Sequence, residues 1–256
     1  MENPIGVFDS GIGGLTLLPA LTSLLPYENI IYIADEAHSP YGKKSQKELL
    51  ERAHIITKEL MEQGCKLILV ACNTATTQVI GPLRNEFKLP FVGIEPGIKP
   101  AAQHTKSRVI GVLATQGTLT SPMYAERANY YKKEITIVEQ IGHGLVNCIE
   151  ENKLDTAETK THLETLLSPM VNAGMDTLLL GCTHYLFLVP LLHKILPAEV
   201  TIIDNSEAVS HQVKRVLSQQ NLLNTITTTG EKKFYSTQKR NRLEKFVEQK
   251  VNYLPL

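Results

Sequence analysis

Tryptophan is absent from the sequence, aromatic residues make up only 6%, and neither sign of charge is in excess. Lysine and arginine together number 26, as do aspartate and glutamate, so the formal net charge is zero. A chain without an overall field is not drawn to nucleic acid or to an anionic membrane. Its longest apolar stretches, such as residues 67–72 and 177–182, are far shorter than the roughly 18 residues that span a bilayer. We therefore expect no nucleic-acid partner, no membrane span, and a small polar molecule as the partner.

Cysteine is scarce, and the spacing of the four residues excludes two kinds of site. They are too few and too scattered for a disulfide framework, and no pair has the spacing of a zinc site, so we predict no metal. Residues 1–9 lack the basic segment and the long apolar run of a signal peptide, so we expect a cytoplasmic protein with reduced thiols. The four are Cys65, Cys72, Cys148 and Cys182.

Short β-branched runs alternate with longer helical patterns along the 256 residues, which is typical of an α/β fold around mostly parallel sheets. The length allows one large domain or two compact ones. Ser45 and Glu48 form a capping box ahead of one helix, and Ser121-Pro122 opens another. The expected strands are residues 5–8, 30–33, 67–71, 92–94, 109–113, 135–138, 177–180 and 201–203.

Two parts of the chain resemble each other. Residues 64–74 align with residues 174–184 at a constant offset of 110, and both copies end a buried strand in a small residue, a cysteine and two polar residues. The strand at 5–8 has a partner at 110–113 in the same way. We therefore predict two pseudo-symmetric, doubly wound domains. Because residues beyond the carboxyl ends of parallel strands face the ligand crevice, the two thiols are expected at a cleft between the domains.

We expect the first domain to cover residues 1–96 and the second 97–206, with the tail 207–256 joining the first. The tail has a helical pattern at 207–218 and a segment rich in lysine and arginine at 232–250. A basic arm for nucleic acid is one interpretation. The apolar spacing favours a helix packed back on the first domain. The residues with that spacing are Leu243, Phe246, Val247 and Val251.

Cys72 and Cys182 are the residues that best indicate chemistry. A buried cysteine at a strand end is usually just a small hydrophobic residue. Two at equivalent points of a duplicated fold, each followed by hydrogen-bonding residues, suit the removal of a proton from one face of a carbon and its return to the other. The thiol needs a neighbour that helps to form the thiolate, and Asp9 and His184 are the candidates. For either helper alone, a capping or solvated role is equally open.

Two turns follow strands of the first domain. Residues 9–14 form a glycine-rich turn that lacks the G-x-G-x-x-G spacing and the lysine of a phosphate-binding loop. Its N–H groups are an alternative site for a small anion such as a carboxylate. Pro40, Tyr41 and Gly42 form the second turn, which together with Ser10 is placed to bind the far end of a substrate.

Five motifs follow one another along the chain: Phe8–Leu15, Ala34-Asp35 with Pro40–Gly42, Ala71–Ala75, Gly93–Pro96 and Leu180–Tyr185. Together they resemble the glutamate racemase family over nearly the whole chain, and residues 234–237 resemble its C-terminal strand. The family is a cofactor-independent, two-base isomerase that interconverts L- and D-glutamate and supplies D-glutamate for peptidoglycan. The resemblance therefore implies that this activity needs no cofactor.

The resemblance also implies roles for individual residues. Cys72 would be the base for the D-isomer, assisted by Asp9, and Cys182 the base for the L-isomer, assisted by His184. The groups that would hold the amino and α-carboxylate groups are Asn73, Thr74 and Thr183, and those that would hold the side-chain carboxylate are Ser10, Tyr41 and Gly42. Asp35 and Glu150 are further carboxylates that the family places near the cleft.

The chain departs from the family pattern at residues 141–150, which replace a Cys-Pro-containing stretch that leads to Val-Pro-x-Val-Glu. This difference predicts a changed cleft wall near Glu150. No lysine lies at the expected strand ends, where pyridoxal phosphate would need one. The alternatives are a racemase for aspartate or another small acid, a cysteine amidase, and a regulatory binding protein. A homodimer is the default assembly, since dimers are the commonest homo-oligomers.

Overall fold

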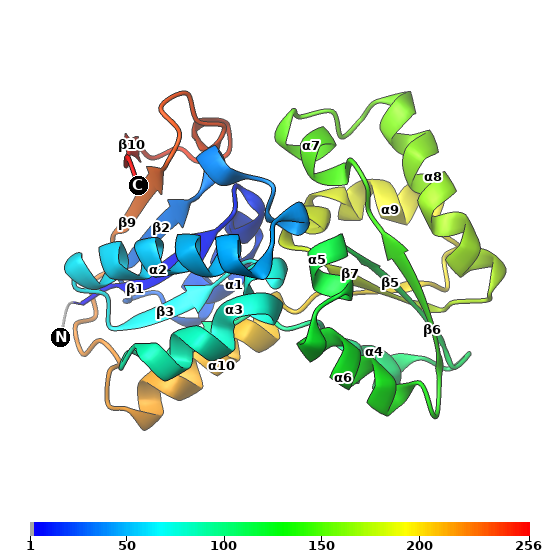
Figure 1. Ribbon diagram of the computed structural model, residues 1–256, viewed down its shortest axis with the longest axis horizontal. Helices are drawn as coiled ribbons and strands as arrows, with labels where there is room; N and C mark the ends of the chain where they lie inside the picture. The colour runs from blue at the N-terminus through cyan, green and yellow to red at the C-terminus, as the bar shows by residue number, and fades with distance from the viewer. Residues whose placement is uncertain (1–2) are drawn as a thin grey trace.

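The computed structural model describes residues 3–256, in which two parallel β-sheets lie side by side and carry helices on their faces (Figure 1). The first sheet has the order β10-β9-β2-β1-β3-β4, and the second has the order β6-β5-β7-β8. The first sheet is formed by β1 (Ile5–Asp9), β2 (Ile30–Ala34), β3 (Leu67–Val70), β4 (Phe91–Gly93), β9 (Lys232–Ser236) and β10 (Val251–Tyr253). The second is formed by β5 (Val109–Ala114), β6 (Thr136–Ile141), β7 (Thr177–Gly181) and β8 (Thr201–Ile203).

The two sheets repeat one strand order, because β2-β1-β3-β4 corresponds to β6-β5-β7-β8. Every pair of neighbouring strands in the described residues is parallel. The central strands β1, β3 and β7 are buried along their whole length, as expected of strands covered by helices on both faces. The predicted α/β class with parallel sheets is confirmed.

The helices begin where the sequence signals them. The Ser45 hydroxyl accepts a hydrogen bond from the N–H of Glu48, whose carboxylate accepts one from the N–H of Ser45, so the capping box is confirmed. Ser121 caps the helix that Pro122 opens. The α-helices are α1 (Leu18–Leu24), α2 (Gln46–Glu62), α3 (Asn73–Glu86), α4 (Ile98–His104), α5 (Gln116–Leu119), α6 (Pro122–Tyr131), α7 (Leu145–Glu150), α8 (Ala157–Asn172), α9 (Val189–Ile195) and α10 (Ser206–Gln219). Short 3₁₀ helices are η1 (Gly13–Leu17), η2 (Glu36–His38), η3 (Tyr41–Lys43), η4 (Thr183–Leu188) and η5 (Leu243–Lys245).

The predicted helix near the end of the tail is wrong. Residues 243–245 form only the 3₁₀ turn η5, and Val251 begins the strand β10. The open edge of β9 offers main-chain groups that a strand can pair with, and this pairing overrides the helical spacing of the apolar residues. Leu243 and Val251 are nevertheless buried in the core, so the tail does pack against the first sheet.

The tail returns to the first sheet, since β9 pairs with β2 and α10 packs against α1 (Figure 1). The domain bounds drawn from the sequence, 1–96 with 207–256 and 97–206, stay a prediction, and residues 1–2 lie outside the described residues. Within residues 3–256, no helix combines the length and the apolar character needed to cross a bilayer.

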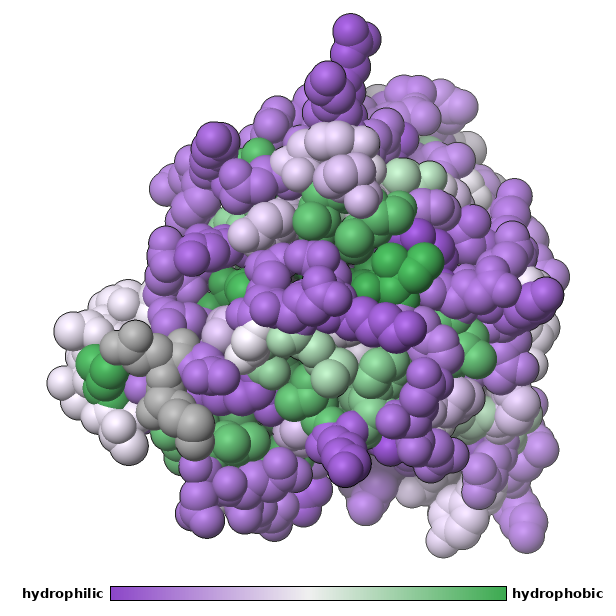
Figure 2. Space-filling model, turned by 60° about the vertical axis from the view of Figure 1, so that its left-hand side comes forward, coloured by the Kyte–Doolittle hydropathy of each residue, from purple (hydrophilic) through white to green (hydrophobic). Residues whose placement is uncertain are grey.

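Hydrophilic side chains cover most of the face in Figure 2, and hydrophobic residues occupy small areas between them. Scattered apolar side chains of this kind are usual on protein surfaces and by themselves indicate no partner. The exposed large hydrophobic residues are Tyr27, Ile55, Met61, Tyr130, Ile226 and Tyr253.

Candidate active site

Loops that follow strands of both sheets meet at one small cavity, which we call the inner cavity. Its lining contains both predicted catalytic thiols and every residue expected at the substrate except Asp9. The lining residues are Ser10, Pro40, Tyr41, Gly42, Cys72, Asn73, Thr74, Thr115, Val146, Cys182, Thr183 and His184. The structure therefore brings together side chains that lie more than 170 residues apart in the sequence.

The two cysteines occupy equivalent positions. Cys72 follows β3 and precedes α3, and Cys182 follows β7 and precedes η4. Both have extended main-chain angles and are buried, with 6% and 7% of their surface exposed. Burial raises the pKa of the Cys72 thiol, and the nearby Asp9 carboxylate raises it further, so this thiol is held protonated.

Asp9 ends β1 directly behind the inner cavity and is fully buried. Its Oδ1 accepts a hydrogen bond from the N–H of Gly11 at 2.8 Å, and its Oδ2 accepts one from the Thr183 hydroxyl at 3.0 Å. Burial raises the pKa of the Asp9 carboxyl, and the positive charge of His184 opposes that shift. Asp9 thus links the loop after β1 to the loop after β7.

His184 lies beside Cys182 in η4, with only 2% of its surface exposed. Its Nε2 lies 3.1 Å from Oε1 of Glu150. Burial disfavours the imidazolium, yet hydrogen bonding to Cys182 and to Glu150 outweighs it and raises the pKa of His184 to about 10. At neutral pH the ring is therefore a cation next to a thiol.

The glycine-rich turn after β1 serves close packing between the two halves of the site. A Cβ at Gly13 would lie 2.3 Å from Nδ1 of His184, and one at Gly11 would lie 2.4 Å from Oε1 of Glu150. The N–H of Gly11 donates to Asp9 and so is taken up within the protein. This one donor is therefore not free for a bound anion, and the anion-binding alternative for the rest of the turn stays a prediction.

Asp35 does not line the inner cavity. It accepts two hydrogen bonds from the Arg52 guanidinium, at 2.9 and 3.0 Å, and one from the Tyr41 hydroxyl at 2.5 Å. Burial opposes the charge, but these donors lower the pKa of Asp35. The carboxylate therefore holds the Tyr41 hydroxyl and does not itself line the inner cavity.

Glu150 ends α7 and lies behind His184 instead of in the inner cavity. It accepts hydrogen bonds from Ser39 and Arg242 as well as from His184. Burial would raise the pKa of Glu150, but the hydrogen bonds from His184 and Ser39 and the charges of His184 and Arg242 lower it. This carboxylate is thus an ionised neighbour of the imidazolium.

Thr115 is a lining residue that the sequence analysis missed. Its hydroxyl lies 2.8 Å from that of Thr74 and donates to Thr118 at 3.0 Å. The internal repeat contained the signal, because Ser10 after β1 and Thr115 after β5 are equivalent once residues 5–8 are aligned with 110–113. Val146 lies in the segment that departs from the family pattern and forms part of the wall.

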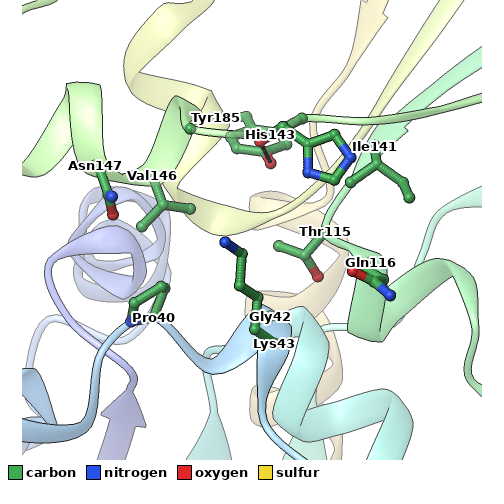
Figure 3. A pocket seen from close by; sticks show the side chains of 12 residues that line it. Pro40, Gly42, Lys43, Thr115, Gln116, Ile141, His143, Val146, Asn147 and Tyr185 are labelled. Carbon is green, nitrogen blue, oxygen red and sulfur yellow. Dashed lines mark hydrogen bonds between the residues drawn. The ribbon is translucent and has the colours of Figure 1, made fainter.

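An outer cavity adjoins the inner one, with which it shares Pro40, Gly42, Thr115 and Val146. Figure 3 shows the side chain of Lys43 pointing into this space from below, with Val146 and Tyr185 on the opposite side. The remaining lining residues are Gln116, Ile141, Gly142, His143, Gly144 and Asn147. The outer cavity therefore adjoins the space that contains the two thiols, and most of its lining surface is apolar.

The family model for Asp/Glu/hydantoin racemases matches residues 16–213, a range that includes both thiols. The chain belongs to this family. A glutamate racemase of Ectopseudomonas mendocina is 46% identical over 225 residues, covering 88% of this chain and 86% of the relative.

Solved structures of family members agree with the fold. A glutamate racemase isoform from Bacillus anthracis superposes with a TM-score of 0.89 at 30% identity, covering 99% of this chain and 98% of that one. A glutamate racemase from Francisella tularensis, solved in complex with D-glutamate, gives 0.85 at 31% identity, covering 99% and 97%. The predicted resemblance and the predicted enzyme class, an isomerase of the racemase type, are confirmed.

Proposed function

We propose that this chain interconverts L- and D-glutamate by moving a proton between the α-carbon and two cysteines. The observation that carries the proposal is the position of Cys72 and Cys182, which follow equivalent strands and line one cavity. The names of the relatives support glutamate as the substrate, and the Francisella relative was solved with D-glutamate bound.

In the direction from L- to D-glutamate, the Cys182 thiolate removes the α-proton. The Cα–H bond breaks, an S–H bond forms, and the electron pair stays on the substrate as a carbanion-like species. The Cys72 thiol then gives its proton to the opposite face and becomes the thiolate. A cation beside a thiol stabilises its thiolate, which is the contribution of His184. Because the pKa of Cys72 is raised, its thiol is protonated and is the proton donor in this direction.

The return direction uses the same groups with their roles exchanged. Cys72 removes the proton from D-glutamate as a thiolate, and Cys182 delivers one. Asp9 assists Cys72, with a carboxyl whose pKa is raised by burial and which stands near both Cys72 and His184. A buried carboxyl whose pKa is raised accepts a proton more readily than an exposed one.

Hydrogen-bond donors around the thiols fit the polar ends of the substrate. We assign the amino and α-carboxylate groups to Asn73, Thr74 and Thr183. The side-chain carboxylate goes to Ser10 and to the turn at Tyr41 and Gly42. Because the Tyr41 hydroxyl already donates to Asp35, the main-chain N–H groups of this turn are the donors that serve the substrate.

Proton NMR of the purified protein with L-glutamate in deuterium oxide tests the proposal. Loss of the α-proton signal together with appearance of D-glutamate is the expected result. Cys72→Ala and Cys182→Ala should each abolish two-way racemisation, and full activity in either variant would contradict the two-base mechanism. Aspartate in the same assay separates a glutamate racemase from an aspartate racemase. Binding of glutamate without exchange at the α-carbon would point to a binding protein instead.

Three wider assignments rest on this activity. We propose that the protein acts in the cytoplasm, that its D-glutamate enters peptidoglycan, and that the chain forms a homodimer. Rescue of a D-glutamate-requiring bacterial strain tests the first two together, with the Cys182→Ala variant as the inactive control. Sedimentation equilibrium of the pure protein tests the third, and a monomer across the concentration range would contradict it.

A further inference from the structure

The tail of the chain reaches the site through Arg242, which lies between β9 and η5. Its guanidinium Nη1 donates to Oε2 of Glu150 at 2.6 Å. The other carboxylate oxygen of Glu150 accepts from the Ser39 hydroxyl at 2.9 Å and faces Nε2 of His184 at 3.1 Å. A continuous line of contacts therefore runs from the tail to the histidine beside Cys182.

Arg242 is itself held in place from the first sheet. Its main-chain N–H donates to Oε1 of Glu36 at 2.8 Å. The other oxygen of Glu36 accepts from the hydroxyl of Ser236, the last residue of β9, at 2.5 Å. The guanidinium is thus presented to Glu150 from a fixed main-chain position, although its side chain is 37% exposed.

The charged groups around Glu150 act on its ionisation in opposite directions. His184 and Arg242 favour the ionised carboxylate, while Asp9 and Glu36 lie close enough to interact with it unfavourably. Glu150 is buried, with 4% of its side chain exposed, so its charge depends on these partners more than on water. Removal of the arginine would leave one cation against three acidic groups.

We propose that Arg242 is a positioning residue of the racemase site, which acts by holding Glu150 against His184 and so keeping His184 in place beside Cys182. The inference rests on the proposed function, because it gives the tail a part in the step that involves Cys182. Nothing in the motifs around the two thiols points to this arginine.

The contacts also cross between the two sheets. Glu150 in α7 and His184 in η4 pack together on the side of the second sheet, whereas Arg242 and Ser39 follow strands of the first. Any separation of the two sides removes two of the three hydrogen-bond partners of Glu150. His184 is fully supported only while the site is closed, which is also when water is excluded from the proton transfers.

The test compares Arg242→Gln and Arg242→Lys with the wild-type protein and with Arg240→Gln, an exposed tail arginine without a hydrogen bond or ion pair in residues 3–256. In Arg242→Gln we expect kcat to fall about tenfold. This is a part of the rate enhancement of about 10² to 10⁴ that general acid–base catalysis supplies. The acid limb of the pH profile should move to higher pH, because Glu150 then binds a proton more readily. Arg242→Lys keeps the cation and should keep the limb near its wild-type position.

Isotope effects separate positioning from a general loss of structure. The two isomers are equally stable, so kcat/KM must fall equally in both directions. The primary deuterium isotope effect should however increase for L-glutamate, whose proton goes to Cys182, and not for D-glutamate. Equal changes in both directions, or an Arg242→Gln variant that matches Arg240→Gln, would overturn the proposal.

A measurement without substrate keeps this result distinct from the proposed function. Carbon NMR of the glutamate carboxyls follows the titration of Glu150, assigned by the loss of its signal in Glu150→Gln. Its midpoint should rise in Arg242→Gln, and an unchanged midpoint would overturn the contact on which the inference depends. A wild-type protein that fails to racemise glutamate would instead contradict the proposed function, whatever the titration shows.

Discussion

The Thr183 hydroxyl donates a hydrogen bond to the Asp9 carboxylate at 3.0 Å, from the loop after β7 to the end of β1. Both residues adjoin groups assigned to proton transfer. Thr183 lies between Cys182 and His184 in the sequence, and Asp9 lies near Cys72. The two proton-transfer halves of the site are therefore joined by a direct contact. Changes on one side are expected to affect the other.

Replacement of Thr183 by valine removes this donor and leaves a buried carboxylate oxygen without its partner. We expect the free energy of unfolding to fall by about 1–3 kcal/mol, the usual cost of such a group, and kcat to fall in both directions. Urea denaturation and the racemisation assay measure the two effects. Thr165→Val is the matched control, because that hydroxyl is exposed and bonds only within its own helix. A Thr183→Val variant as stable as this control would contradict the role of the contact.

Gly13→Ala tests the close packing of the two halves. Its Cβ would lie 2.3 Å from Nδ1 of His184 and 2.5 Å from Oγ1 of Thr183, so the two sides must move apart. A misplacement of about 1 Å at reacting groups costs about a hundredfold in rate, and we expect a loss of this order in kcat. Gly81→Ala in α3 meets no atom within 4 Å and should be active and more stable by about 0.5–1 kcal/mol. Equal activity of the two variants would show that the packing is unimportant.

Asp35→Asn should weaken the fold, although Asp35 does not itself line the inner cavity. Breaking a buried ion pair costs about 3–5 kcal/mol, because Arg52 then remains without its counter-charge. The pKa of Asp35 is lowered in the folded state, so its stabilising effect is present above the unfolded pKa of about 3.9 and is lost as the pH falls below it. The stability difference between wild type and variant should therefore shrink below about pH 4 in denaturation series. Exposed Asp155→Asn should show no such difference at any pH.

The charge on His184 should set the alkaline side of the activity profile. Its pKa is raised from 6.5 to about 10, so the stabilisation from the imidazolium is complete below about pH 6.5 and is lost as the pH rises through about 10. We expect kcat with L-glutamate to decline across that upper range, and His184→Asn to lack this decline while being slower at neutral pH. A wild-type decline centred near pH 6.5 would mean that the ring is not held as a cation.

The sequence alone predicted the thiols and most of the inner cavity, because these residues lie directly after strands whose pattern is repeated. It did not place Arg242 or Ser39, which reach Glu150 from loops with no local signal of their own. Asp35 lies directly behind the lining residue Tyr41, and its partner Arg52 in α2 carried no signal in the sequence. The apolar spacing near Leu243 predicted a helix that does not form. The segment instead ends in β10, which pairs with the edge strand β9, and this contact between distant segments has no local signal in the sequence.

The pairing of β2 with β9 has a consequence for the order in which the chain acquires structure during synthesis. The second sheet is complete once residues 109–203 are available, so it is able to form as a continuous unit. The first sheet keeps an unpaired edge at β2 until residues 232–253 have left the ribosome. Exposed edges invite pairing with other chains, so the nascent protein is most prone to aggregation in this interval. The half that carries Cys72 is started first and finished last.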